Sequence, residues 1–300
     1  MIVSEVEGKN EYNNWKEWFG AITNLKGKWI YRGQSSSAEL VSTLERECRK
    51  FGLELDPYAE NIEKQMIRQF QRVYDGDDRQ KVQEDTLYCI SLMRHYGAPT
   101  RLLDFTYSKY VAMYFGLESA YENMPNNEKE LPDYSAKRGC TIWCIDREKL
   151  LSKAAGIPEV QTLLNKRSYD KYRCNKTFIQ LYMENKFTFA LWETPLQLHR
   201  RLHLQQATFL CPGNIKVKLM NNLREPCGKE EPDFIKKFTY FFTLDELREA
   251  FDEFMLMDIT RESLFPGLDG LATSMRYQLW FYKKLHEDID KNKTILGVKT

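Results

Sequence analysis

The chain has no excess of charge of either sign, because its 300 residues carry 44 lysines and arginines against 43 aspartates and glutamates. This balance excludes the overall electrostatic attraction to nucleic acids or anionic membranes that a strongly basic chain has. No apolar run approaches the length of about 20 residues that crosses a bilayer. The first ten residues, MIVSEVEGKN, also lack a basic segment leading into an apolar run. We therefore expect no signal peptide, no membrane partner and no strong nucleic-acid binding.

Cysteines are few, odd in number at seven, and without the paired CxxC spacing of a zinc site. Reduced thiols in a cytoplasm explain this pattern better than a disulfide scaffold, so we expect a cytoplasmic protein without a metal site. His199 and His203 are four residues apart but have no acidic motif beside them, which argues against metal binding.

No internal repeat is present, and 300 residues can form a hydrophobic core large enough to fold without disulfides or a structural metal. This favours a single domain over residues 1–300. We expect an N-terminal helix within 1–27, a core bearing the sequence motifs at 28–272, and a C-terminal helix and tail at 273–300.

Hydrophobic periodicity predicts about nine helices and about five strands that do not alternate regularly. Such an order indicates an α+β fold, with one mixed β-sheet core of about five or more strands and extensive helical cover. The strands are expected at 28–31, 140–145, 188–192, the apolar end of 199–210, and 234–242, with a further extended stretch at 100–105.

The segment from His95 to Thr106 reads HYGAPTRLLDFT and joins a predicted helix to an extended stretch. Gly97 and Pro99 end the helix, because glycine tolerates positive φ and proline disfavours the α conformation in the residue before it. Arg101 and Asp104 then lie beside leucines and need partners if buried. An internal brace between this arginine and a carboxylate is favoured over a ligand contact, with Arg101 and Asp104 holding the junction. For the histidine, a helix-terminal hydrogen bond to a carbonyl is favoured over catalysis.

Arg32 and Gly33 end the β-rich run at 28–31. A glycine lets a ligand approach the backbone, and a guanidinium offers a planar fork that matches phosphate or carboxylate. As an isolated dipeptide, however, Arg-Gly is more often a surface turn.

Four motifs together resemble the FRG domain family of bacterial proteins, which is named for a Phe-Arg-Gly sequence. They are YRGQ at 31–34, HYGAPTRLLDF at 95–105 with VAMYFG at 111–116, RLHLQQATF at 201–209, and LFPGLDGLA at 264–272. Tyr31 stands where the family name has phenylalanine. The motifs occur in the family's order, and their pattern is similar to that of ADP-ribosyltransferases. The resemblance implies an ADP-ribosyltransferase-like fold that uses NAD as a substrate, with no prosthetic group.

The resemblance also implies roles for individual residues. Arg32, Thr106 and Gln206 would be catalytic, and Asp104 a structural brace. Cleavage of the nicotinamide–ribose bond develops positive charge on the ribose, which a carboxylate stabilises better than a glutamine. Glu193 and Glu262 are the nearest acidic substitutes in the sequence, although both are more simply surface acids. Ligand contacts would come from Tyr31, Gly33, Gln34, His95, Tyr96, Arg101, Ser108 and Arg201.

Two functions therefore stay open from the sequence. In the first, the protein binds NAD or a related nucleotide and transfers ADP-ribose to a macromolecular target. In the second, a non-catalytic module uses Arg32, Arg101 and Gln206 to bind a phosphate-bearing ligand or an acidic segment of a partner protein. A metal-dependent hydrolase has less support, because the acidic run at 75–78 is predicted to be a solvated turn.

Overall fold

The computed structural model describes residues 11–35, 37–123, 138–166, 171–197, 199–228, 230 and 232–275. Within them, seven strands form one sheet in the order β1-β7-β4-β2-β3-β6-β5. β1 runs parallel to β7, and the other neighbouring pairs are antiparallel, so the predicted mixed sheet of an α+β fold is confirmed. The strands are β1 (Glu11–Tyr12), β2 (Trp29–Gln34), β3 (Leu103–Thr106), β4 (Arg138–Asp146), β5 (Ala190–Glu193), β6 (Ala207–Pro212) and β7 (Ile235–Phe242).

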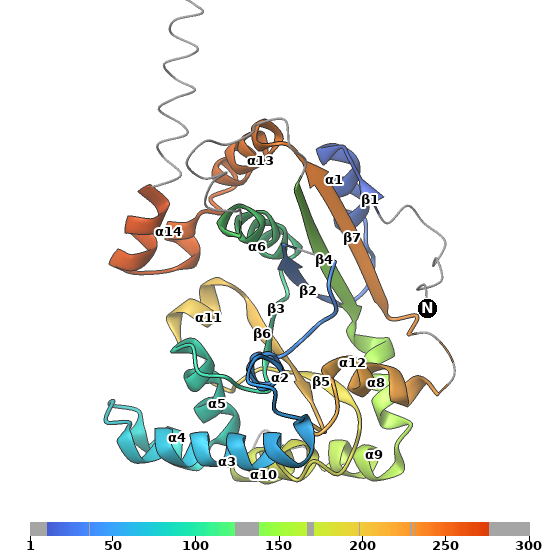
Figure 1. Cartoon of the computed structure of the whole chain (residues 1–300), viewed down its shortest axis with the longest axis vertical. Helices are drawn as coiled ribbons and strands as arrows, with labels where there is room; N and C mark the ends of the chain where they lie inside the picture. The colour runs from blue at the N-terminus through green and yellow to red at the C-terminus, as the bar shows by residue number, and fades with distance from the viewer. Residues whose placement is uncertain are drawn as a thin grey trace, which may run out of the picture.

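Helices cover both faces of this sheet (Figure 1). One face packs against α1 (Trp15–Thr23), α6 (Lys109–Glu122) and α13 (Leu244–Leu256). The other face carries most of the remaining helices, while the short helices α11 (Arg200–Leu204) and α14 (Arg261–Leu264) lie towards one side of the molecule. The remaining elements are α2 (Thr43–Lys50), α3 (Leu55–Val73), α4 (Arg79–Glu84), α5 (Thr86–His95), α8 (Arg147–Ala155), α9 (Pro158–Asn165), α10 (Lys171–Phe178), the π-helix η1 (Ile179–Met183), α12 (Leu219–Arg224) and the 3-10 helix η2 (Glu225–Cys227).

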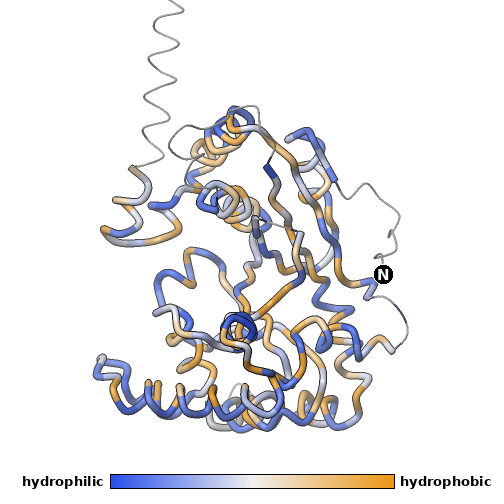
Figure 2. Tube along the Cα trace, in the orientation of Figure 1, coloured by the Kyte–Doolittle hydropathy of each residue, from blue (hydrophilic) through white to orange (hydrophobic). Residues whose placement is uncertain are grey.

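Alternation along the central strands supplies a separate core to each face. In β2, Tyr31 joins the core beneath α6, whereas Ile30 points into the core beneath α3 and α5. In β4, Ile142 and Trp143 divide in the same way. Figure 2 shows the complementary pattern in the outer helices, where hydrophobic and hydrophilic residues alternate as expected for helices with one buried side.

Several sequence-based boundaries need correction. The apolar pattern over 82–96 predicts one helix, but this segment contains the end of α4 and the whole of α5, because the Asp85 side chain accepts a hydrogen bond from Tyr88 N and caps a new helix. The strand β1 and the helix α14 were not predicted. In contrast, the sequence Thr243-Leu244-Asp245-Glu246 has the form of a capping box and predicts a helix start, and both hydrogen bonds of that box are present. A last helix begins at residue 268, and the predicted tail beyond residue 275 lies outside the described residues.

None of the helices in the described ranges has the length and apolar character needed to cross a membrane.

Candidate functional site

A cleft of about 280 Å³ lies where β2 and β3 separate beneath α6. These two strands share a single register pair, Tyr31 with Thr106, so they diverge beyond it. Gly33 makes this architecture feasible, because a Cβ atom there would lie 2.0 Å from the carbonyl oxygen of Ala112 in α6. Gly33 does line the cleft, but its first requirement is the close approach of α6, which the sequence interpretation attributed to a ligand.

Asp104 lies at the centre of a cluster of arginines in this cleft. Arg94, at the end of α5, donates to Asp104 Oδ2 from Nε at 3.0 Å and from Nη2 at 2.6 Å. Arg32 Nη1 donates to the Asp104 carbonyl oxygen at 2.7 Å and lies 3.9 Å from Oδ2. Burial opposes ionisation of Asp104, but the charges of Arg94, Arg32 and Arg201 outweigh it and hold the pKa of this carboxyl below its ordinary value. The carboxylate still has 45% of its side-chain surface exposed.

The cluster has more positive than negative charge. Burial lowers the pKa of Arg32 to about 10 against the attraction of Asp104, so its guanidinium stays charged at neutral pH. Its Nε is buried and has no hydrogen-bond partner. Arg201 also lines the cleft, with its guanidinium 4.4 Å from the centre of the Phe265 ring. Arg32, Arg94 and Arg201 therefore surround one carboxylate, which leaves an excess of two positive charges suited to an anion.

Carboxylates line the opposite wall of the cleft. Glu118 and Glu122 both reach it from α6, because residues four apart share one face of a helix. Glu118 accepts hydrogen bonds from Arg261 Nη1 at 2.7 Å and from the Tyr114 hydroxyl at 3.2 Å. Burial raises the pKa of Glu118, and the charge of Arg261 acts against that rise. Neither acid is among the acidic candidates that the sequence suggested, because α6 is buried over most of its surface and only the tertiary structure places these two side chains at the cleft.

The two acids suggested by the sequence do not reach the cleft. Glu193 is 6% exposed and accepts a hydrogen bond from the Tyr182 hydroxyl. Glu262 is exposed on α14, where it is the residue after Arg261. The i, i+4 spacing of Glu118 and Glu122 on the helix after HYGAPTRLLDF was the signal that could have found the cleft acids instead.

Of the predicted catalytic residues, Arg32 and Thr106 line the cleft and Gln206 does not. Thr106 Oγ1 donates to the Gln205 carbonyl oxygen at 2.7 Å and accepts from Ser108 N at 3.0 Å, so its hydroxyl already has two partners. Gln206 is exposed and has a positive φ of 46° at the turn between α11 and β6. This turn places Gln205 in the cleft, where its side chain donates to the Leu264 carbonyl oxygen at 3.1 Å. The structure therefore places Gln205, and not Gln206, in the lining of the cleft.

The predicted ligand contacts divide into two groups. Tyr31, Gly33 and Arg201 line the cleft. Ser108 instead caps α6, as its position before that helix predicts, by accepting from Val111 N. Outside the cleft lining, Gln34 donates to the Ala38 carbonyl oxygen, and the side chain of Tyr96 is largely exposed.

His95 packs against a second histidine rather than lining the cleft. Its ring centre lies 4.3 Å from that of His199. Burial, followed by the nearby charge of Arg201, lowers the pKa of His95. Burial, His95 and Arg201 lower the pKa of His199 to about 4, so this ring is neutral at physiological pH.

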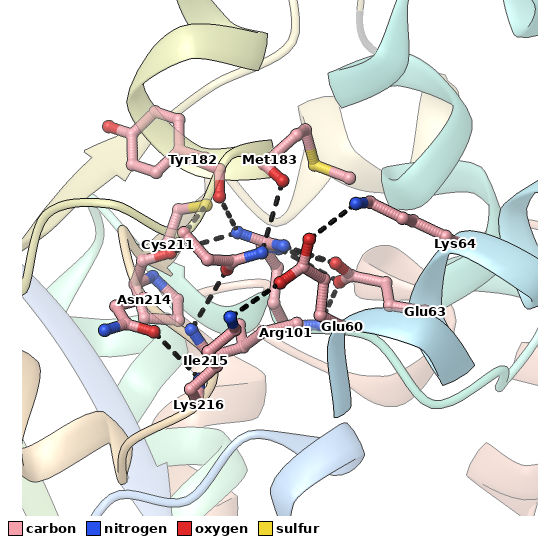
Figure 3. Close-up of polar contacts among 12 residues, drawn as sticks. Glu60, Glu63, Lys64, Arg101, Tyr182, Met183, Cys211, Asn214, Ile215 and Lys216 are labelled. Atoms are coloured by element: carbon pink, nitrogen blue, oxygen red, sulfur yellow. Dashed lines mark hydrogen bonds and ion pairs between the residues drawn. The ribbon is translucent and has the colours of Figure 1, made fainter. Parts of the chain in front are cut away.

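Arg101 lies in the core and not in the site. Its side chain is fully buried, and Nε donates to both carboxylate oxygens of Glu63 at 3.0 Å. Nη1 donates to the carbonyl oxygens of Tyr182 and Pro212, so α3, η1 and β6 meet around one guanidinium (Figure 3). The internal brace is confirmed, but pairing with Asp104 is wrong, because alternation along the extended chain points the two side chains in opposite directions. A ligand contact by Arg101 does not fit this closed position.

In the residues that the structure describes, no group of three or more histidines, cysteines or acidic residues could hold a metal ion.

Comparison with known families matches residues 27–124 to the FRG domain. This segment contains β2, α5, the HYGAPTRLLDF motif, β3 and α6, which together supply Arg32, Arg94 and Asp104 as well as the acidic wall. The segments that contribute Arg201 and Phe265 lie outside the matched range. Neither the curated proteins nor the solved structures contain a match to the chain.

Proposed function

We propose that the protein binds a nucleotide, NAD or a related one, with its phosphates on the arginines beside Asp104. The observation that carries this proposal is the excess of positive charge in a partly exposed cluster, where Arg32, Arg94 and Arg201 surround a single carboxylate. A guanidinium can bind phosphate through two parallel hydrogen bonds, which makes arginine the usual residue for phosphate recognition. The FRG match over residues 27–124 supports the same site, because two of the three arginines lie within it.

The shape of the cleft supports a nucleotide of modest size. Its volume of about 280 Å³ is near the lower end of the range for small-molecule sites, roughly 300–1,000 Å³. Phe115 and Phe265 give it apolar walls next to the charged cluster. A nucleoside monophosphate has this combination of a flat apolar base and an anionic end. For NAD, the cleft would hold one half of the molecule.

Transfer of ADP-ribose to a macromolecular target is the second candidate function, and Glu118 favours it. In this reaction the nicotinamide–ribose bond breaks and its electron pair leaves with nicotinamide. The target's nucleophile then bonds to the ribose and loses a proton. Glu118 and Glu122 supply the carboxylates that such a cationic ribose needs, which Gln206 cannot. Arg261 offsets the charge of Glu118, which favours binding without transfer.

Calorimetric titration of the purified protein with NAD, adenosine monophosphate and adenosine tests the binding proposal. We expect both phosphate-bearing ligands to bind and adenosine to bind far more weakly. Arg201→Gln should weaken binding by about tenfold or more, or about 1.4 kcal/mol, because it removes one guanidinium from the phosphate. Arg200→Gln is the matched control, since the adjacent Arg200 is exposed and does not line the cleft. The absence of binding, or equal effects of the two variants, would contradict the proposal.

Nicotinamide release from NAD, measured with candidate target proteins present, separates the two functions. If transfer occurs, Glu118→Gln should abolish nicotinamide release while NAD still binds, because the amide keeps the shape and loses the charge. Binding of NAD without any release would identify a non-catalytic module.

A further inference from the structure

Three cations gather on the sheet face that lies away from α6. Arg32 in β2 and Lys237 in β7 are both register partners of Trp143 in β4. Directly paired residues of antiparallel strands project from the same face, and two strand spacings place the outer pair about 10 Å apart. Arg46 on α2 is the third cation, close enough for its charge to lower the pKa of Arg32. The chain leaving β2 leads directly into α2 on this side of the sheet (Figure 1).

This basic group has little matching negative charge. Across the described ranges, no carboxylate forms an ion pair with Arg46 or Lys237, and the carboxylate oxygen Oδ2 of Asp104 lies 3.9 Å from Arg32 Nη1. Glu39, whose charge acts on Lys237, is itself paired with Arg224 at 3.1 Å.

Lys237 retains donor capacity. Its ammonium group donates to the Ser37 carbonyl oxygen at 2.9 Å and lies 4.7 Å from the centre of the Trp143 ring. A lysine ammonium has three hydrogen-bond donors, so an additional acceptor can be bound there.

Two buried donors on the same face also lack acceptors. The indole Nε1 of Trp143 has no hydrogen-bond partner although the residue is only 3% exposed. Arg32 Nε is likewise buried and unpartnered. Buried N–H groups nearly always have an acceptor. The unpaired N–H groups of Trp143 and Arg32 lie beside two cations that have no ion pair, so we infer that a negatively charged acceptor binds among them.

We propose that Arg32, Arg46, Trp143 and Lys237 form a second anion subsite, and that the ligand is a nucleotide with two separate anionic groups. This inference rests on the proposed nucleotide binding and specifies the class of nucleotide. Arg32 joins the two subsites, because it lines the cleft and also neighbours Trp143 in the sheet. One phosphate binds beside Asp104, and a second phosphate on the ribose reaches the opposite side of Arg32.

Titration with adenosine 5′-monophosphate, adenosine 2′,5′-bisphosphate and adenosine 3′,5′-bisphosphate tests the second subsite. We expect at least one bisphosphate to bind about tenfold more tightly than the monophosphate. Lys237→Gln and Arg46→Gln should each remove most of this advantage and change monophosphate affinity less than about twofold. Lys236→Gln is the control, since this neighbouring lysine projects from the other face of β7 over Trp29 and should leave both affinities unchanged.

An NMR measurement adds a readout that does not depend on a variant's stability. The indole N–H resonance of Trp143, assigned through Trp143→Phe, should shift with the bisphosphate and remain in place with the monophosphate. The second subsite would be contradicted if all three ligands bound with equal affinity, or if Lys237→Gln lowered the affinity for all three by the same factor. Either result would leave the proposed nucleotide binding intact. If no adenosine phosphate binds, the proposed function fails and the second subsite fails with it.

Discussion

Arg101 and Asp104, the two charged residues of the TRLLD segment, lie three positions apart but in different surroundings, one in the core and the other in the cleft. Arg101 is fully buried and has one carboxylate partner, Glu63, with carbonyl oxygens taking its other donors. Asp104 is 45% exposed and has three guanidiniums around it. The charges balance around Arg101, whereas around Asp104 three guanidiniums face one carboxylate. A buried charge is stable only with a counter-charge beside it. An excess of positive charge at a partly exposed position can instead bind an anionic ligand.

Breaking the core pair should have the largest effect. Arg101→Met leaves Glu63 buried without its counter-charge, and we expect the free energy of unfolding to fall by about 3–5 kcal/mol in chemical denaturation. Lys64→Gln is the control for an exposed pair, because Lys64 pairs with Glu60 at the surface, and it should cost less than about 1 kcal/mol. Adding Glu63→Gln to Arg101→Met should recover part of the loss. Equal costs for the buried and exposed pairs would contradict the role of Arg101.

A substitution at Gly33 tests how closely β2 and α6 pack beside the cleft. Gly33→Ala places a Cβ against the Ala112 carbonyl, so α6 must move, and we expect a loss of about 2–3 kcal/mol in unfolding free energy together with weaker nucleotide binding. Gly20→Ala is the matched control. Gly20 lies inside α1 with no atom within 4 Å of a new Cβ, so alanine should stabilise the protein by about 0.5–1 kcal/mol. An unchanged free energy of unfolding in Gly33→Ala would show that α6 can accommodate a Cβ atom at this position.

The histidine pair beside the cleft should make stability depend on pH. His199 has its pKa lowered to about 4 by burial, His95 and Arg201, while its unfolded pKa is about 6.5. Between these values the unfolded state binds more protons, so unfolding free energy should fall as pH drops from about 6.5 to 4. His199→Gln should flatten this slope by about 1–2 kcal/mol, measured by denaturation across pH. An unchanged slope in His199→Gln would argue against the buried neutral ring.

Removing the one carboxylate in the arginine cluster should have the smallest effect and the opposite sign. Asp104→Asn keeps the shape and increases the surplus positive charge, so we expect adenosine monophosphate to bind about threefold more tightly, or about 0.6 kcal/mol. The dependence of this affinity on salt should also become steeper, since screening acts on charge attraction. Weaker binding in Asp104→Asn would mean that holding Arg94 and Arg32 in place matters more than their net charge.

Local patterns predicted the parts of the fold that depend on neighbours in the chain. The apolar run at 140–145 became the central strand β4, and Thr243 with Glu246 capped α13. Ser108 capped α6 for the same reason, since a cap is decided within a few residues. The partner of Arg101 was not predictable in this way, because Glu63 lies 38 residues away on α3.

The candidate site was predicted unevenly for a related reason. Arg32, Thr106 and Arg201 were found through short motifs, and all three line the cleft. Gln206 does not line the cleft, because its positive φ turns the chain before β6, and alternation along a strand does not predict such a turn. Glu118 was missed because the cleft that it borders forms only where β2 diverges from β3, and no local pattern on α6 shows that opening.

By itself, the sequence determined that HYGAPTRLLDF ends a helix, continues as an extended strand and brings an arginine and a carboxylate near apolar residues. It determined this because glycine, proline and alternation act through local sterics. Only the tertiary structure decided which charge is compensated. Glu63 and the carbonyls of η1 and β6 enclose Arg101, while three arginines from separate elements converge on Asp104 at an opening between strands. Burial and long-range pairing make Arg101 a structural residue of the core and place Asp104 in the candidate site. Both depend on how distant segments pack together, which the local sequence does not determine.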